Sequence, residues 1–142
     1  MNEALEAAED VREGVVRLSH RLRMLRQTHG VSPSGIALLS RLYRGGPATP
    51  KALAEAESAA PQTLTRVIAA LEEQGLVRRR PDPDDGRGAI LEITADGRVV
   101  LRSHAAVHVA WLAEAITAEL TQAEQELLRV AADLLDRLAD HR

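Results

Sequence analysis

The sequence lacks cysteine and phenylalanine and has few other aromatic residues. Among its 142 residues only Tyr43 and Trp111 carry large aromatic rings, so aromatics make up 1% of the chain. The absence of cysteine excludes disulfide scaffolds, thiolate zinc sites and thiol redox sensing. The scarcity of rings removes the stacking platforms on which many single-strand nucleic-acid-binding proteins depend. The core must be built from leucine, valine, isoleucine and alanine, which favours helices over an all-β sandwich.

An excess of charge of one sign is also missing. The 18 basic and 21 acidic side chains give a formal net charge of −3, and lysine occurs once, at Lys51. This balance excludes a uniformly basic coat for nucleic acid. No uninterrupted apolar run approaches the ~18 residues of a membrane span, and the acidic start of the chain does not resemble a signal peptide. We therefore expect a cytoplasmic protein with no membrane partner.

The charges are unevenly distributed along the chain. Residues 1–10 contain four acidic residues and no basic one, whereas residues 12–44 contain seven arginines and one glutamate. Three consecutive arginines, Arg78 to Arg80, follow within a middle segment whose net charge is negative. Because most charge runs form solvated faces, these clusters alone do not identify a binding site.

Apolar residues recur at helical spacing in six segments that capping residues and glycines delimit. The predicted helices cover about residues 2–28, 33–44, 50–57, 61–74, 94–119 and 122 to near the end of the chain. Ser32 and Thr49 are the expected N-caps of the second and third helices, and Thr121 with Glu124 predicts a capping box for the last. Two short strands, about residues 76–80 and 89–94, flank a run of turn formers and predict a hairpin.

Three short helices followed by a two-stranded hairpin are the element order of a winged helix-turn-helix. The predicted fold class is mostly α with a small β-hairpin wing, flanked by N- and C-terminal dimerisation helices. Residues 31–94 are the predicted DNA-binding region, and residues 1–30 and 95–142 form the helical dimerisation region of one intertwined domain. The long terminal helices have more apolar surface than one small domain can cover, so a twofold homodimer is expected.

The segment from Leu53 to Thr94 carries the most specific set of residues. Its members are Thr63-Leu64-Thr65-Arg66, Leu71, Gly75-Leu76-Val77, Arg79, Pro81, Asp82, Asp85, Arg87, Leu91, Ile93 and Thr94. With them the chain resembles the MarR family of transcriptional regulators over essentially its whole length. The resemblance implies a homodimeric repressor on a palindromic operator, released by a small aromatic or anionic effector. It also implies that Asp85 supports Arg87, which enters the minor groove.

Two features depart from that family pattern. The helix predicted over about residues 61–74 is in the position of the recognition helix. Ala60 stands where many relatives have serine or aspartate at the start of that helix, which removes a capping oxygen worth about 1 kcal/mol. The recognition helix also carries Arg66 as its single cation and has Glu72 and Glu73 near its end, so its attraction for phosphate should be modest.

DNA binding needs cations or amides that hold phosphates and polar side chains that reach base edges. The candidate DNA-binding residues are Lys51, Gln62, Thr63, Thr65, Arg66, Arg79, Asp85 and Arg87. Gln62 and Arg66 are assigned to bases, and Lys51 and the two threonines to phosphates or groove walls. The weakly hydrated guanidinium of Arg87 suits a narrow minor groove. The three consecutive arginines cannot share one role, because alternate strand residues point to opposite faces.

His104 and His108 lie four residues apart on the predicted long helix, with Trp111 three residues further on. Such a pair can bind a metal, pack against neighbours or line a ligand cavity, and the spacing leaves all three open. No third metal ligand is evident, so no metal or cofactor is predicted. The effector cavity implied by the family resemblance would be lined by His20, Met24, Tyr43, His104, His108 and Trp111.

The predicted function is that of a double-stranded DNA-binding transcriptional regulator. The alternative is a winged-helix protein-interaction module without specific DNA binding, which the acidic middle segment and Ala60 favour. An enzyme is not predicted, because the sequence contains no nucleophile motif, metal quartet or convergent acid–base pair.

Overall fold

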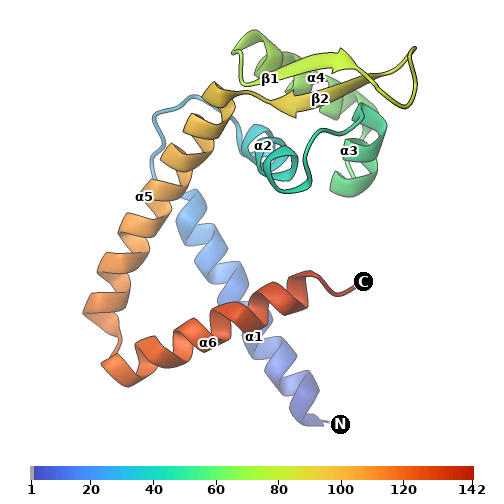
Figure 1. Cartoon of the computed structure of the whole chain (residues 1–142). Helices are drawn as coiled ribbons and strands as arrows, with labels where there is room; N and C mark the ends of the chain where they lie inside the picture. The colour runs from blue at the N-terminus through green and yellow to red at the C-terminus, as the bar shows by residue number, and fades with distance from the viewer. Residues whose placement is uncertain (1) are drawn as a thin grey trace. The chain divides into compact units, whose positions relative to one another are not determined.

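The structure, a computed structural model, describes residues 2–142. Its elements are α1 (Asn2–Arg23), α2 (Pro33–Gly45), α3 (Pro50–Glu57), α4 (Pro61–Glu73), β1 (Val77–Pro81), β2 (Ala89–Ile93), α5 (Ala95–Glu119) and α6 (Gln122–Ala139) (Figure 1). This mostly helical fold with a two-stranded hairpin confirms the predicted fold class. The contacts divide the chain into two compact units, Met1–Leu25 with Ala106–Arg142, and Arg26–Ala105. The predicted division into dimerisation and DNA-binding regions concerns roles and stays a prediction.

The predicted helix caps are present in the structure. Ser32 and Thr49 each accept a hydrogen bond at 3.1 Å from the backbone N–H three residues ahead. Thr121 Oγ1 accepts from the Glu124 N–H at 3.3 Å, while the Glu124 carboxylate accepts from the Thr121 N–H at 2.8 Å. The backbone hydrogen bond from Thr121 holds the pKa of Glu124 below its ordinary value. These bonds satisfy N–H groups that have no partner within their own helix, and they fix where α2, α3 and α6 begin.

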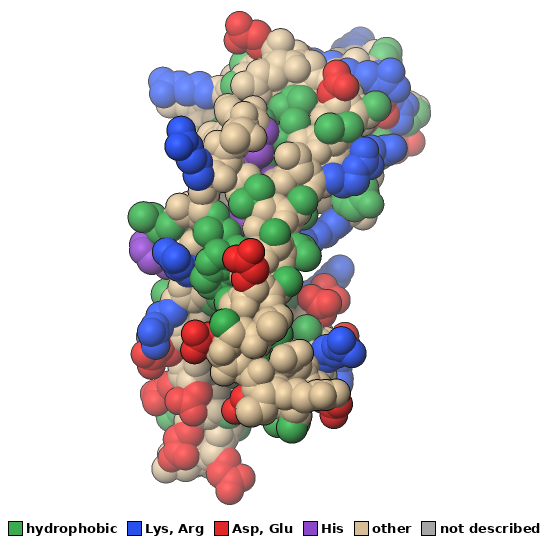
Figure 2. All heavy atoms as spheres, turned by 90° about the vertical axis from the view of Figure 1, so that its left-hand side faces the viewer, with side chains coloured by type: hydrophobic (Ala, Val, Ile, Leu, Met, Phe, Trp, Pro, Cys, Tyr) green, Lys and Arg blue, Asp and Glu red, His purple; other side chains and the backbone are tan. Residues whose placement is uncertain are grey.

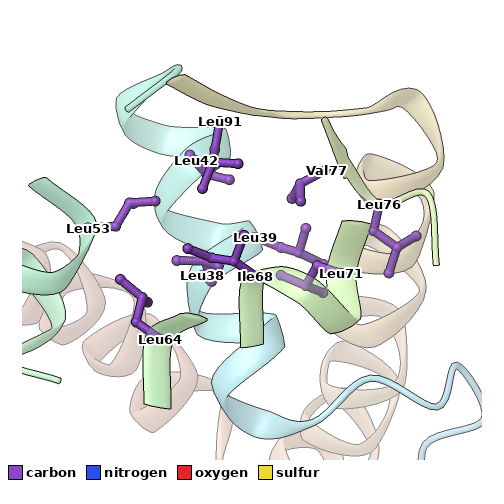
Figure 3. Close-up of a cluster of buried hydrophobic side chains, with 10 residues drawn as sticks. All are labelled: Leu38, Leu39, Leu42, Leu53, Leu64, Ile68, Leu71, Leu76, Val77 and Leu91. Atoms are coloured by element: carbon purple, nitrogen blue, oxygen red, sulfur yellow. The ribbon is translucent and has the colours of Figure 1, made fainter. Parts of the chain in front are cut away.

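Aliphatic side chains alone form the core of the second unit, as the scarcity of aromatic residues requires. Ten buried residues make up this cluster (Figure 3): Leu38, Leu39, Leu42, Leu53, Leu64, Ile68, Leu71, Leu76, Val77 and Leu91. They come from α2, α3, α4, the turn after α4 and both strands of the hairpin. The core therefore holds α4 and the β1–β2 hairpin against α2.

The hairpin pairs β1 with β2 in antiparallel register, with Arg78 opposite Glu92 and Arg79 opposite Leu91. A two-residue bridge joins β2 to the segment before α3: the Ala48 N–H donates to the Leu91 carbonyl at 3.0 Å, and the reverse bond measures 2.8 Å. Each strand starts and ends within one residue of its predicted bounds. The wing is thus anchored at its base to the helix-turn-helix.

The start of α5 is fastened to the end of α4 by one side chain. Thr94 Oγ1 donates to the Gly75 carbonyl at 2.7 Å and accepts from the Gly97 N–H at 3.1 Å. The Thr94 N–H also donates to the Leu76 carbonyl at 3.0 Å. Gly75 has φ 72°, a left-handed conformation that favours glycine and reverses the chain after α4. Thr94 therefore caps α5 and links its start by hydrogen bonds to the turn after α4.

The first helix is shorter than its apolar periodicity predicts. It ends at Arg23 instead of near Thr28. In the segment that follows, His29 Nδ1 accepts from the Val31 N–H at 3.0 Å, and His29 Nε2 lies 3.1 Å from His104 Nδ1 on α5. These contacts hold residues 26–31 in a non-helical connection, so tertiary structure outweighs the local helical pattern.

The first unit leaves most of its large apolar side chains exposed. Neither α1 nor α6 has a buried residue within the part of the chain that is described. Figure 2, which looks onto the α5 side of Figure 1, shows hydrophobic side chains at the surface between charged ones. Within residues 2–142, α5 is the one helix that is long and apolar enough, by length and composition, to cross a membrane. It also carries charged residues such as Arg102 and Glu114, and one such helix is a weak indication of a span.

Candidate nucleic-acid interface

The first two turns of α4 present polar side chains to solvent. Gln62, Thr63 and Arg66 are exposed, whereas Leu64 and Ile68 on the opposite face are buried in the core. This amphipathic pattern fixes the orientation of the helix and directs its polar face outward. The N-terminus of a helix also favours anions, because its first N–H groups lack helical partners. Polar side chains and free N–H groups therefore share one surface at the start of α4.

The two threonines of this surface differ in their hydrogen bonds. Thr65 Oγ1 donates to the Pro61 carbonyl at 2.8 Å, which uses the only hydrogen of its hydroxyl group. A Thr65 contact to a phosphate oxygen would require this bond to break. Thr63 makes no such bond within residues 2–142, and Lys51 is exposed in the first turn of α3. Of the two hydroxyl groups, Thr63 is the better placed to donate.

The tip of the wing is organised by aspartate side chains. Asp85 Oδ1 accepts from the backbone N–H of Arg87 at 3.1 Å, and Asp82 Oδ1 accepts from the Asp84 N–H at 2.9 Å. Both are side-chain-to-backbone turns that hold a short loop in one conformation. The Arg87 side chain is exposed and has no ion pair within the described chain. Asp85 thus positions Arg87 through the backbone and leaves its guanidinium available.

The three consecutive arginines of β1 point to two faces, as strand geometry requires. Arg79 Nε donates to Glu72 at the end of α4 at 2.8 Å. Arg78 and Arg80 lie on the other face and both donate to Glu92 of β2. Glu72 is ten residues beyond Gln62, about 15 Å along the helix axis, so the ion pair directs Arg79 toward the far end of α4. The DNA contact predicted for Arg79 stays a prediction.

The sequence does not single out Glu92, nor the pairing of Glu72 with Arg79. Glu92 can be found from the strand register, because Glu92 lies directly opposite Arg78 once the two strands are paired. A shift of one residue would have placed these side chains on opposite faces. The signal for Glu72 is weaker, because its contact with Arg79 depends on how the wing packs against α4.

The six residues predicted to line an effector cavity belong to both units. His20, Met24, His108 and Trp111 lie in the first, and Tyr43 and His104 lie in the second. Within the first unit, the Arg21 guanidinium lies 5.4 Å from the centre of the Trp111 ring. Within residues 2–142, no group of three or more histidine, aspartate or glutamate side chains could hold a metal ion. The effector cavity stays a prediction.

Ala60 is the N-cap residue of α4 and supplies no capping hydrogen bond. We expect Ala60→Ser to raise the free energy of unfolding by about 0.5–2 kcal/mol, because its extended backbone (φ −62°, ψ 136°) suits a capping side chain. Urea denaturation at fixed protein concentration measures the change. The matched control, Ala69→Ser, adds the same hydroxyl at an exposed position inside α4 and should lower stability slightly. Equal effects of the two changes would contradict the capping explanation.

Known proteins that are similar to this chain in sequence or in fold are transcriptional regulators. A profile of the MarR family matches residues 31–88, which include α2, α3, α4 and the start of the wing. An HTH-type transcriptional regulator of Mycobacterium tuberculosis is 38% identical over 133 residues, covering 94% of this chain and 92% of that protein. A protein of Pseudomonas aeruginosa described as a transcriptional regulator superposes with a TM-score of 0.86 and 31% identity, over 100% of this chain and 99% of the other.

The fold is also similar to that of Escherichia coli MarR in complex with operator DNA. That mutant protein superposes with a TM-score of 0.62 and 21% identity, over 94% of this chain and 96% of its own. The chain is therefore a winged helix-turn-helix protein with long flanking helices. It belongs to the MarR family of transcriptional regulators. These regulators are not enzymes, in agreement with the prediction from the sequence.

Proposed function

We propose that this regulator binds double-stranded DNA in a sequence-specific manner and acts as a homodimeric, ligand-responsive repressor on a palindromic operator. The observation that carries the proposal is the exposed polar face at the start of α4, with Gln62 and Arg66 opposite a buried apolar face. Such a face, held rigidly by the core, is what a recognition helix needs to enter the major groove. The wing supplies Arg87, whose backbone Asp85 holds.

Each side chain has a distinct role in this proposal. Gln62 and Arg66 read base edges, because an amide and a guanidinium can each form two hydrogen bonds with one base. Thr63 and Lys51 hold phosphates, and Arg87 enters the minor groove. Thr65 contributes only after giving up its bond to the Pro61 carbonyl, and Arg79 contributes through the guanidinium N–H groups that its Nε bond to Glu72 leaves unused.

A homodimer is supported by the apolar side chains that the first unit leaves exposed. The exposed apolar residues of α1, α5 and α6 include Leu5, Val15, Leu18, Val109, Leu127, Val130, Leu134 and Leu138. Isolated exposed apolar residues are ordinary, but rows of them along three helices indicate a surface that a second copy covers. Two recognition helices would then reach half-sites about one DNA turn apart.

Regulation by an effector completes the proposal. Two of the residues proposed for effector binding, Met24 and Tyr43, are 67% and 62% exposed, so a ligand could reach them. A small aromatic or anionic molecule is the proposed ligand class, and the cytoplasm is the proposed location of a protein that acts on DNA.

Arg66→Ala and Arg87→Ala are each expected to weaken specific DNA binding by about 1–3 kcal/mol, because each removes a guanidinium from a groove contact. Fluorescence anisotropy with the DNA upstream of the protein's own gene, at one fixed salt concentration, measures the loss. Arg44→Ala is the matched control, since it removes the same charge from α2, outside both α4 and the wing. Wild-type affinity in both test variants would contradict the assignment.

The same titration distinguishes the alternative function. If no duplex, including the upstream DNA, binds more tightly than random sequence, the winged helix is better explained as a protein-interaction module. The acidic residues of the middle segment and the uncapped start of α4 are the features that favour that alternative.

A further inference from the structure

Arg78 and Arg80 form a cationic pair on the outer face of the wing, separate from Arg79. Strand alternation places them on the same face as Glu92, which lies directly opposite Arg78 in the register. The Nε of Arg78 donates to Oε1 of Glu92, and the Nε of Arg80 donates to Oε2 at 3.1 Å. One carboxylate therefore binds two arginines, one with each oxygen.

The exposure of these three side chains is unequal. The Glu92 side chain is 17% exposed, whereas those of Arg78 and Arg80 are 69% and 43% exposed. The hydrogen bond from Arg78 holds the pKa of Glu92 below its ordinary value, partial burial opposes this, and Arg80 adds to the lowering. Glu92 is thus ionised at neutral pH, and the group of three carries one net positive charge.

Free cations near DNA increase affinity for any sequence. Each phosphate that a protein cation neutralises steepens the dependence of log K on log salt by about 0.9 and favours nonspecific sites as much as specific ones. Surface ion pairs contribute little to stability, so the fold has little need of Glu92 for that purpose. In the proposed function the wing faces DNA, so Glu92 on β2 affects DNA binding more than it affects stability.

We propose that Glu92 is a specificity-determining residue, which holds Arg78 and Arg80 along the wing and so limits sequence-independent attraction for phosphates. Glu72 holds Arg79 in the same manner on the other face. Arg87 is then the wing cation that has no carboxylate partner within residues 2–142. The binding free energy depends mainly on the α4 face and Arg87, where sequence is read. This inference rests on the DNA-binding function proposed above.

The test compares E92Q with E73Q in the full-length protein on a random-sequence duplex. The E92Q replacement keeps the shape of the side chain but removes the charge that holds the two arginines. Glu73 is exposed on α4 and in no ion pair within residues 2–142, so E73Q changes the net charge equally without releasing an arginine. Anisotropy titrations at several salt concentrations should show tighter binding for E92Q and a salt slope steeper by up to about 1.8 per protomer. E73Q removes an acidic charge from the end of α4 and should tighten binding slightly, but it should leave the salt slope almost unchanged because it releases no arginine.

A double replacement, R78Q with R80Q, completes the experiment. Because the group of three carries one net positive charge, the double replacement should weaken binding only slightly in the wild-type background. It should abolish the gain in the E92Q background, because the arginines that E92Q releases are then missing. The proposal is overturned if E92Q and E73Q behave alike, or if the double replacement weakens both backgrounds equally. Thermal unfolding followed by circular dichroism checks that the wing remains folded, and Glu92→Thr, which introduces a strand-favouring side chain, serves if E92Q unfolds.

If the proposed sequence-specific binding is wrong, the titrations give a result different from the one that overturns the role of Glu92. That result is equal affinity of the wild-type protein for its upstream DNA and for random DNA. The comparison of E92Q with wild type uses random DNA only and is unaffected by that outcome. If neither protein binds any duplex, the role of Glu92 is also overturned.

Discussion

Gly97→Ala is expected to lower the free energy of unfolding by about 3 kcal/mol, because a side chain at this position has no space. A Cβ added to Gly97 would lie 2.3 Å from the Leu76 carbonyl oxygen and 2.7 Å from Cγ1 of Ile93. The first neighbour is backbone, which cannot move aside without disturbing the bond from the Thr94 N–H to the same oxygen. Helix propensity alone would favour alanine by about 1 kcal/mol, so the sign of the result separates packing from propensity. Urea denaturation at one protein concentration measures the change.

Gly45→Ala is the matched control for this prediction. Gly45 is the last residue of α2, and a Cβ there would have no neighbour within 4 Å. The same substitution should therefore raise stability by up to about 1 kcal/mol, mainly by reducing the freedom of the unfolded chain. A Gly97→Ala protein as stable as wild type would show that α5 packs less closely against the end of α4 than the structure indicates.

The parts of the fold that were predictable from sequence have short-range causes. Ser32 and Thr49 each precede a proline at the first helical position, Thr121 precedes Glu124 at the spacing of a capping box, and each caps its helix through an N–H three residues ahead. The turn formers between the strands predict the hairpin in the same way. Such signals lie within a few residues of their effect, so they can be recognised without knowledge of tertiary contacts.

The features that were not predictable depend on contacts between distant segments. The contact of His29 with His104 joins residues 75 positions apart, and it accompanies a connection where the periodicity predicted helix. Thr94 was recognised as the start of α5, but its bond to Gly75 requires knowing that α4 ends beside it. Glu92 required the strand register, and a shift of one residue would have hidden it.

The candidate DNA-binding surface was predictable in its residues but not in their partners. Gln62 and Arg66 follow from the apolar spacing of α4, because a helix with one buried face must present the other to solvent. The ion pairs of Arg79 and its neighbours depend on packing of the wing and could not be read from a run of arginines. The sequence predicted that these arginines lie on two faces, and the structure adds the acidic partner of each one.

Leu39→Ala is expected to have the largest effect on stability, a loss of about 2–5 kcal/mol. Leu39 is 0% exposed, and Figure 3 shows it in the middle of the buried cluster, between α2 and the side chains Ile68 and Leu71 of α4. Removing three carbon atoms there leaves a cavity that the surrounding helices can fill only in part. Because this cluster holds α4 in place, DNA affinity should also fall at temperatures where the variant remains mostly folded. Urea denaturation and anisotropy on the same samples measure both effects.

Leu39→Met separates the cavity from the identity of the side chain. Methionine has nearly the volume of leucine and can adapt its shape, so this variant should lose less than about 1.5 kcal/mol. With few aromatic residues available, the core consists of many small aliphatic contacts, and a single large void cannot be closed by the shift of a ring. Losses of similar size in the two variants would mean that the core at Leu39 is sensitive to shape and not to lost volume, contrary to the cavity argument.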